Sequence, residues 1–176
     1  MGRILALVPL VSLALLACSD AVTAPSQQAE PTVLQARFGE SPQAELLTEV
    51  MQATALFNSV TQATKHGYLD SGECVAVPVL GGMGVHWLNP GLVDPVFDPL
   101  HPEALLYEPG PNGQSRLVGV EYIVVDVGQP APDFAGRAFD VGGTPLPIAH
   151  WNLHVWLWRE NPSGMFEAFN PDVTCP

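Results

Sequence analysis

The most strand-like segment of the chain reads Leu117-Val118-Gly119-Val120-Glu121-Tyr122-Ile123-Val124-Val125. In an extended strand, alternate side chains point to the same face of a sheet, so Glu121 shares its face with Leu117, Ile123 and Val125. A carboxylate on such an apolar face is costly unless it is paired with another group or coordinated to a metal ion. We therefore expect a buried strand whose middle residue finds a polar partner elsewhere in the chain.

Several shorter apolar runs surround this segment and predict an antiparallel sheet of about four to five strands. The first of these runs, Val75–Leu80, is expected at the edge of the sheet, because Pro78 interrupts it and cannot donate a backbone hydrogen bond. Asn112-Gly113 marks a hairpin turn before the central segment. Two proline-rich loops, 89–102 and 127–149, connect the remaining pieces. The expected strands are Val75–Leu80, Met83–Leu88, Ala104–Glu108, Arg116–Asp126 and Trp151–Trp158.

A long amphipathic helix is predicted before the strands, over residues 42–66. Ser41 can cap it, and Pro42 falls in the first turn, where the missing N–H costs nothing. An apolar stripe with helical spacing runs from Leu46 to Val60, and Gly67 is the expected stop. One helix followed by antiparallel strands predicts an α+β fold, with the helix packed across one face of the sheet. The order of elements resembles cystatin-like and NTF2-like architectures, a likeness that implies no function.

The first 17 residues have the features of an export signal. Arg3 supplies a positive start, and a short apolar run follows that is too short to span a bilayer. The run ends in Leu15-Leu16-Ala17-Cys18, which resembles a bacterial lipobox. This resemblance implies a lipoprotein signal peptide at 1–17, cleavage before Cys18 and attachment of lipid to that cysteine. The alternative is an ordinary secretory peptide in which Cys18 has no special role.

The signal divides the chain into three parts. Residues 18–41 are rich in Ala, Thr, Ser, Pro and Gln, and we predict a flexible tether there. Residues 42–176 then form a single α+β domain. Because Ser19, and not Asp, follows the cysteine, the resemblance favours the outer membrane over retention at the inner one. We expect an exported, lipid-anchored protein of the cell envelope, on the periplasmic or outer side.

The net charge of the chain restricts the class of its partner, and its cysteine count predicts a disulfide bond. The formal net charge is −12 and the sequence pI is about 4.5, which argues against nucleic acid as a partner. After cleavage the two remaining cysteines, Cys74 and Cys175, form an even pair in an exported protein, which predicts one disulfide bond. Two reduced thiols or a bond between chains are the alternatives.

Three predicted strands each carry one ionisable residue near the middle: His86, Glu121 and His154. Two imidazoles and a carboxylate can hold a divalent ion such as zinc, copper or manganese and leave a position open. They could also form a general acid/base pair. Alternatively, both histidines belong to the core and Glu121 bonds one of them or an arginine. Further candidates for the same site are Glu103, Glu108 and His150.

Aromatic residues recur in the same strands and could form either a ligand-binding surface or part of the core. They could stack on sugar rings if exposed, but filling the core opposite the helix is the favoured interpretation. The group comprises Trp87, Tyr107, Tyr122, Trp151, Trp156 and Trp158.

Four blocks together resemble a set of uncharacterised exported bacterial proteins, many of them lipoproteins. The blocks are Gly82–Pro90, Pro102–Glu108, Leu117–Tyr122 and the run from Leu153 through Asn161-Pro162-Ser163-Gly164-Met165-Phe166. The resemblance covers about residues 45–176 and implies no activity. It suggests that His86, Glu121, His154 and the two cysteines belong to one pattern.

These observations favour a lipid-anchored binding or accessory module with a metal or ligand site, and not an enzyme. A metal-dependent or acid/base hydrolase using the same residues is the first alternative. A structural or protein-interaction lipoprotein without a small-molecule site is the second. A membrane, reached through the lipid on Cys18, is the one partner that the sequence identifies.

Overall fold

The computed structural model describes residues 2, 37–39, 41–143 and 146–175. The predicted signal peptide at 1–17, apart from Gly2, and the predicted lipidation at Cys18 lie outside the described residues. The same holds for all but four residues of the predicted tether. None of the described helices is long and apolar enough to cross a membrane.

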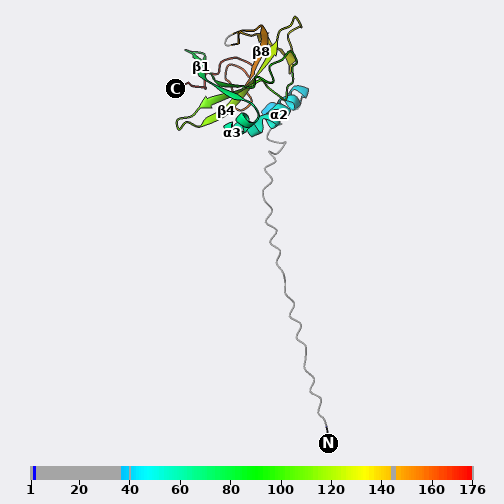
Figure 1. Cartoon of the computed structure of the whole chain (residues 1–176), viewed down its shortest axis with the longest axis vertical. Helices are drawn as coiled ribbons and strands as arrows, with labels where there is room; N and C mark the ends of the chain where they lie inside the picture. Colours follow the sequence, from blue (N-terminus) through cyan, green and yellow to red (C-terminus); the bar gives the residue numbers. More distant parts are fainter. Residues whose placement is uncertain (1, 3–36, 40, 144–145, 176) are drawn as a thin grey trace.

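The fold is α+β, as the sequence predicts, and consists of a helical segment and a curled antiparallel sheet (Figure 1). Six strands pair in the order β1-β2-β3-β4-β8-β7, and β5 and β6 form a small separate sheet. The helical elements are α2 (Pro42–Thr54), the 3-10 helix η1 (Ala55–Asn58) and α3 (Val60–Lys65). The strands are β1 (Leu69–Val77), β2 (Gly81–Leu88), β3 (Ala104–Pro109), β4 (Ser115–Val125), β5 (Asp133–Phe134), β6 (Arg137–Ala138), β7 (Asp140–Val141) and β8 (His150–Val155).

The strand count exceeds the predicted four to five because the 127–149 loop is partly structured. It contributes β7, which pairs with β8, and the β5–β6 hairpin. These strands have two residues each and are too short to give an alternating pattern in the sequence. The strand β1 lies at the sheet edge, as Pro78 predicts, but it begins earlier, at Leu69, and ends before the proline.

The prediction of one long helix over 42–66 is wrong: α2 has 13 residues, and the four-residue η1 separates it from α3. Both ends of the helical stretch lie where the sequence predicts them. At the start, Ser41 Oγ accepts from the backbone N–H of Ala44. At the end, Gly67 follows α3 with φ +92°. Ser59, between η1 and α3, has an extended backbone with φ −100° and ψ 113°. The helical stretch is therefore broken in its middle and not at its caps.

Hydrogen bonds to the backbone accompany this break. The side chain of Asn58 donates to the carbonyl of Ala55 at 3.1 Å, competing with the regular helical bond. The hydroxyl of Tyr107, on β3, donates to the carbonyl of Phe57. Phe57, before the break, and Ala63, after it, are both buried in the core.

Two apolar clusters cover the two faces of the sheet. The larger one joins the helical segment to the sheet through residues such as Val50, Phe57, Tyr107, Tyr122 and Val155. The smaller one, on the opposite face, comprises Leu106, Val118, Trp156 and Val173. Because both faces are covered, nearly all of β4 is buried.

The aromatic group that the sequence singles out belongs to this core, as favoured. Tyr107, Tyr122 and Trp156 are at most 1% exposed. Trp87, Trp151 and Trp158 are partly buried against the larger cluster. Their position leaves no basis for a sugar-stacking surface built from these rings.

A bulge in β4 corrects the predicted alternation. Leu106 pairs with Gly119, but the next residue, Tyr107, pairs with Leu117, so that Val118 is an extra residue. Beyond the bulge the faces exchange, and Leu117 joins the larger cluster while Glu121 stays on the other face. The predicted shared face of Leu117 and Glu121 is thus wrong.

The C-terminal segment docks on β2 and is held there covalently. Asn170 forms an isolated bridge with Gly82, and a Cβ on the adjacent Gly81 would lie 2.0 Å from the Asn170 carbonyl oxygen. The predicted disulfide is confirmed: Cys74 on β1 is bonded to Cys175 across a sequence separation of 101 residues. The bond joins the edge strand to the end of the chain.

Replacing both cysteines by serine should lower the free energy of unfolding by about 4–5 kcal/mol, because a loop of this length no longer restricts the unfolded chain. Urea unfolding of the oxidised protein and of the Cys74→Ser/Cys175→Ser variant measures the difference. Reductant should destabilise the native chain and leave the variant unchanged. Equal stability of the two proteins would contradict the predicted role of the bond.

Candidate metal centre

Three neighbouring strands bring His86, Glu121 and His154 together on the face opposite the helical segment. Glu121 on β4 is paired directly with His154 on β8. His86 comes from β2, on the far side of β3, where it is paired with Leu106. The β3 residue opposite Glu121 is Ala104, whose small side chain leaves room for the imidazole of His86 to reach across.

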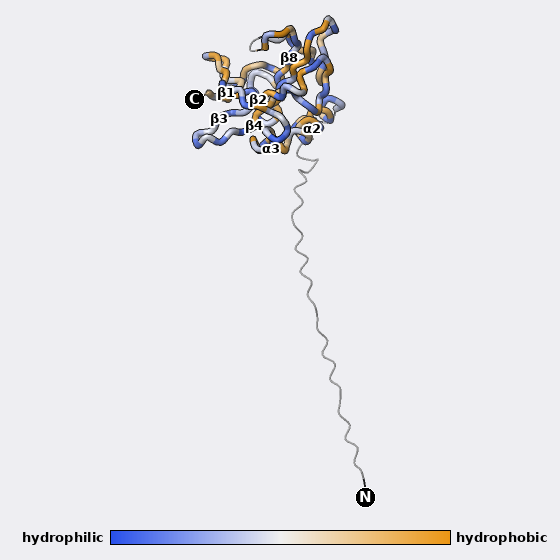
Figure 2. Tube along the Cα trace, viewed as in Figure 1, coloured by the Kyte–Doolittle hydropathy of each residue, from blue (hydrophilic) through white to orange (hydrophobic). Residues whose placement is uncertain are grey.

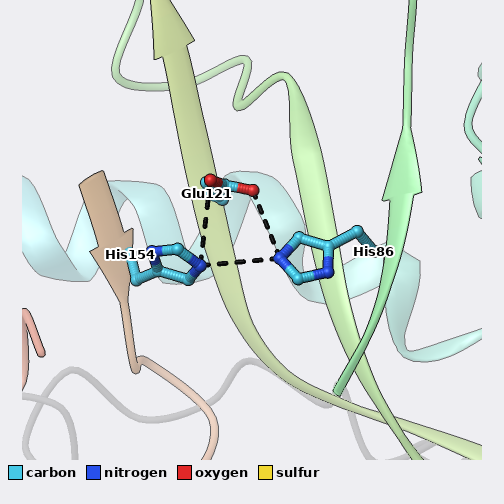
Figure 3. A group of neighbouring side chains, drawn as sticks. All are labelled: His86, Glu121 and His154. Carbon is cyan, nitrogen blue, oxygen red and sulfur yellow. Dashed lines mark hydrogen bonds and ion pairs between the residues drawn. The ribbon is translucent and has the colours of Figure 1, made fainter. Parts of the chain in front are cut away.

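The three side chains point at one another, with the helix lying behind the sheet (Figure 3). The Nε2 atom of His86 lies 3.4 Å from Oε2 of Glu121 and 3.5 Å from Nε2 of His154. The Nε2 atom of His154 lies 3.8 Å from Oε1 of Glu121. One donor atom from each residue therefore lies within 4.8 Å of the other two, and the group could hold a metal ion.

These separations suit a small tetrahedral ion. With zinc–ligand bonds of about 2.0–2.1 Å, adjacent ligand atoms of a regular tetrahedron are about 3.3 Å apart. The two shortest separations in the group, 3.4 and 3.5 Å, are within about 0.2 Å of this edge length. Glu121 contacts His154 through its other oxygen, Oε1, at 3.8 Å, so the side chains must shift before one carboxylate oxygen and the two Nε2 atoms occupy three corners of the tetrahedron. The fourth corner would remain open.

Burial favours the neutral imidazole that a metal ligand requires. The side chain of His154 is 5% exposed, and loss of solvation lowers its pKa below the ordinary value. The charge of Glu121 opposes this lowering of the pKa, whereas the charge of His86 adds to it. Metal binding needs deprotonated ligands, so a lowered imidazole pKa reduces competition from protons. The side chain of His86 is 16% exposed and forms the more accessible side of the group.

Asn152 is a further member of the site that the sequence analysis does not single out. Its side-chain amide donates to Oε1 of Glu121 at 3.2 Å. This contact orients the carboxylate and leaves Oε2 facing His86. The signal was present in the sequence, because Asn152 lies two residues before His154 and so shares its face in the strand.

The structure does not bring Glu103, Glu108 or His150 to this group. Glu108 accepts from Arg116 at 3.0 Å and from Arg159 at 3.2 Å near the C-terminus. His150 lies at the start of β8, where Nδ1 is 2.8 Å from the carbonyl oxygen of Ile148.

Glu103 has a separate, structural place just before β3. It is 1% exposed, and its Oε2 atom accepts from the backbone N–H of Ile123 at 2.8 Å. Burial raises the pKa of this carboxyl to about 8, with smaller contributions from the charges of Asp94 and Glu121. The side chain thus extends the β3–β4 pairing by one hydrogen bond.

Comparisons with known proteins add no assignment: no family model, curated protein or solved structure matches this chain.

Glu103→Gln tests the buried carboxyl through the pH dependence of stability. The folded-state pKa is raised from 4.5 to about 8, so the stabilising contribution is full below pH 4.5 and is lost as the pH rises towards 8. The glutamine does not ionise and should be more stable than wild type at pH 8 by on the order of 4 kcal/mol, with a difference below about 1 kcal/mol at pH 5.

Urea unfolding at both pH values measures this effect. Glu49→Gln, which removes a carboxylate at an exposed position on α2, is the matched control for the loss of one charge. A pH-independent difference between wild type and Glu103→Gln would contradict the assignment.

Proposed function

We propose that this protein is a lipid-anchored module of the cell envelope that binds a divalent transition-metal ion through His86, Glu121 and His154. The observation that carries the proposal is the convergence of these side chains from three strands, with the Nε2 atoms 3.5 Å apart. Histidines placed in a core for packing alone have no need to face each other and a carboxylate. A metal ion bonded to all three accounts for this arrangement directly.

The donor set favours some ions over others. Imidazole nitrogen suits zinc and copper, whereas manganese prefers sites made mainly of oxygen. Two imidazoles and one carboxylate therefore favour copper or zinc, with manganese third. The ion would also add positive charge to a chain whose formal net charge is −12, so the surrounding field favours its binding.

The proposed location is supported by the sequence and by the disulfide. The lipobox-like tetrapeptide ending at Cys18 supports a lipid anchor on the periplasmic or outer side of the envelope. The Cys74–Cys175 bond is consistent with an oxidising compartment such as the periplasm. The acidic charge gives no support to nucleic acid as a partner.

Metal loading tests the proposal most simply. The full chain, purified in its disulfide-bonded form and equilibrated with excess zinc or copper, should retain about one ion after dialysis. His86→Ala and His154→Ala should each lower the retained metal at least tenfold, since each removes one of three ligands. Elemental analysis gives the metal-to-protein ratio.

His101→Ala is the matched control, because His101 is an exposed histidine outside the group and should not affect loading. Retention of the metal by both site variants would contradict the proposal. A wild-type protein that binds neither zinc nor copper, and that His86→Ala merely destabilises, would favour a structural network in a protein-interaction lipoprotein.

A metal-dependent hydrolase is the second candidate, favoured by one observation. The group supplies only three ligands, and His86 is its more exposed member, so a fourth position would face outward. Bound zinc with an open position supplies an activated water for hydrolysis. Zinc-dependent cleavage of activated ester or phosphate substrates that is lost in His154→Ala would support this candidate, whereas tight zinc binding without any turnover would favour the binding module.

A further inference from the structure

The β1–β2 hairpin ends in an exposed apolar tip, defined here as Val77–Leu80. The side chains of Val77, Val79 and Leu80 are 38%, 98% and 51% exposed. Figure 2 shows this hydrophobic segment projecting from the domain next to the β1 label. Single exposed apolar residues are common, but three within four residues at a projecting turn form a continuous apolar surface.

The conformation of the turn does not explain the presence of Val79. The N–H of Leu80 donates to the carbonyl of Val77 at 3.2 Å, which closes a four-residue turn with Pro78 in its second position. Val79, in the third position, has φ +74°, where glycine is favoured and a β-branched residue is strained. The chain thus keeps a valine that destabilises the turn and contacts almost nothing in the domain.

The tip also lacks charge. No charged residue occurs from Val75 to Val85, in a chain that carries a formal net charge of −12. The neighbouring β3–β4 turn lies at the same end of the sheet, because β2 and β3 are antiparallel, and Pro109–Ser115 has no charged residue either. The two turns themselves can therefore enter an apolar phase without burying an ion, whereas Glu108, Arg116 and Arg159 at the base of the β3–β4 turn would remain in water.

We infer that the tip inserts into the lipid surface to which the protein is anchored, with uncharged or zwitterionic lipid as its partner. The inference rests on the lipid anchor at Cys18 in the proposed function. The 24 residues from Cys18 to Ser41 could reach up to roughly 75 Å when extended, well beyond the radius of a domain of this size. The anchor keeps the tip at high effective concentration near the bilayer, so a small apolar contact is sufficient.

A bilayer fits the tip better than an added β-strand from another protein. The outer edge of β1 carries Asp70 and Glu73, and its pairing with β2 is interrupted between Asp70 and Cys74. Charges and irregular pairing are features that discourage strand addition at a sheet edge. The tip itself is convex, and insertion into a fluid apolar layer needs no complementary groove.

Tryptophan quenching by brominated lipid tests the insertion. Leu80→Trp is compared with Val127→Trp, each in the full lipidated chain reconstituted in vesicles of brominated phosphatidylcholine. Val127 is 68% exposed and follows β4 at the opposite end of the sheet, so it is a matched apolar position away from the tip. Leu80→Trp should lose most of its added emission, and Val127→Trp should lose little.

Val79→Gly provides a second, independent measurement. Glycine relieves the positive φ, so the melting temperature should rise by about 2–4 °C. In the mature chain that begins at Ser19, which lacks both the apolar leader and the lipidated cysteine, Val79→Gly should weaken flotation with phosphatidylcholine vesicles by about tenfold, since one valine side chain is lost from the bilayer. A structural role for the valine would instead lower the melting temperature and leave flotation unchanged.

The possible results distinguish a failure of the proposed lipid anchor from a failure of the tip to insert. If the chain that begins at Ser19 floats as strongly as the native chain, the lipid anchor is wrong, and quenching of Leu80→Trp in vesicle-bound protein alone decides the insertion. If Leu80→Trp is quenched no more than Val127→Trp in vesicle-bound protein, the tip does not insert and contacts water or a protein. If no form of the chain associates with vesicles at millimolar lipid, both the anchor and the insertion are wrong.

Discussion

Strand β4 has both faces covered, and the carboxylate of Glu121 lies in its middle. Water cannot solvate such a group freely, so its charge must be balanced by neighbouring side chains or by an ion. His154 faces it from β8, His86 reaches it across β3, and Asn152 fixes one of its oxygens. The need to accommodate this one carboxylate links strands that are far apart in the sequence.

The surrounding fold makes this meeting possible through small features. Ala104 opens the space over β3, and the bulge at Val118 moves Leu117 to the helix side while keeping Glu121 on the other. The C-terminal segment, held by the disulfide, covers the part of the same face around Trp156. The site thus occupies the portion of that face beside the covered apolar patch, where His86 retains some exposure.

The sequence was most informative where one residue departed from an otherwise regular pattern. A lone ionisable side chain in each apolar strand was enough to predict the three members of the group, and an even cysteine count was enough for the disulfide. The helix break was not predictable, since the Tyr107 hydroxyl that bonds the Phe57 carbonyl comes from 50 residues further along the chain. The sequence also did not reveal that Glu108 lies outside the group. Its partners Arg116 and Arg159 come close to it only through the pairing of β3 with β4 and the folding of the C-terminal part of the chain.

The central claim is that the Nε2 atoms of His86 and His154 bind the metal ion. Long-range ¹H–¹⁵N spectra of the imidazole rings, recorded during zinc titration, test it atom by atom. The account predicts large shifts of these two Nε2 resonances, and no change at His66, His101 or His150, until one equivalent of zinc is bound. Shifts at the other histidines in their place, or no shift at any ring, would contradict it.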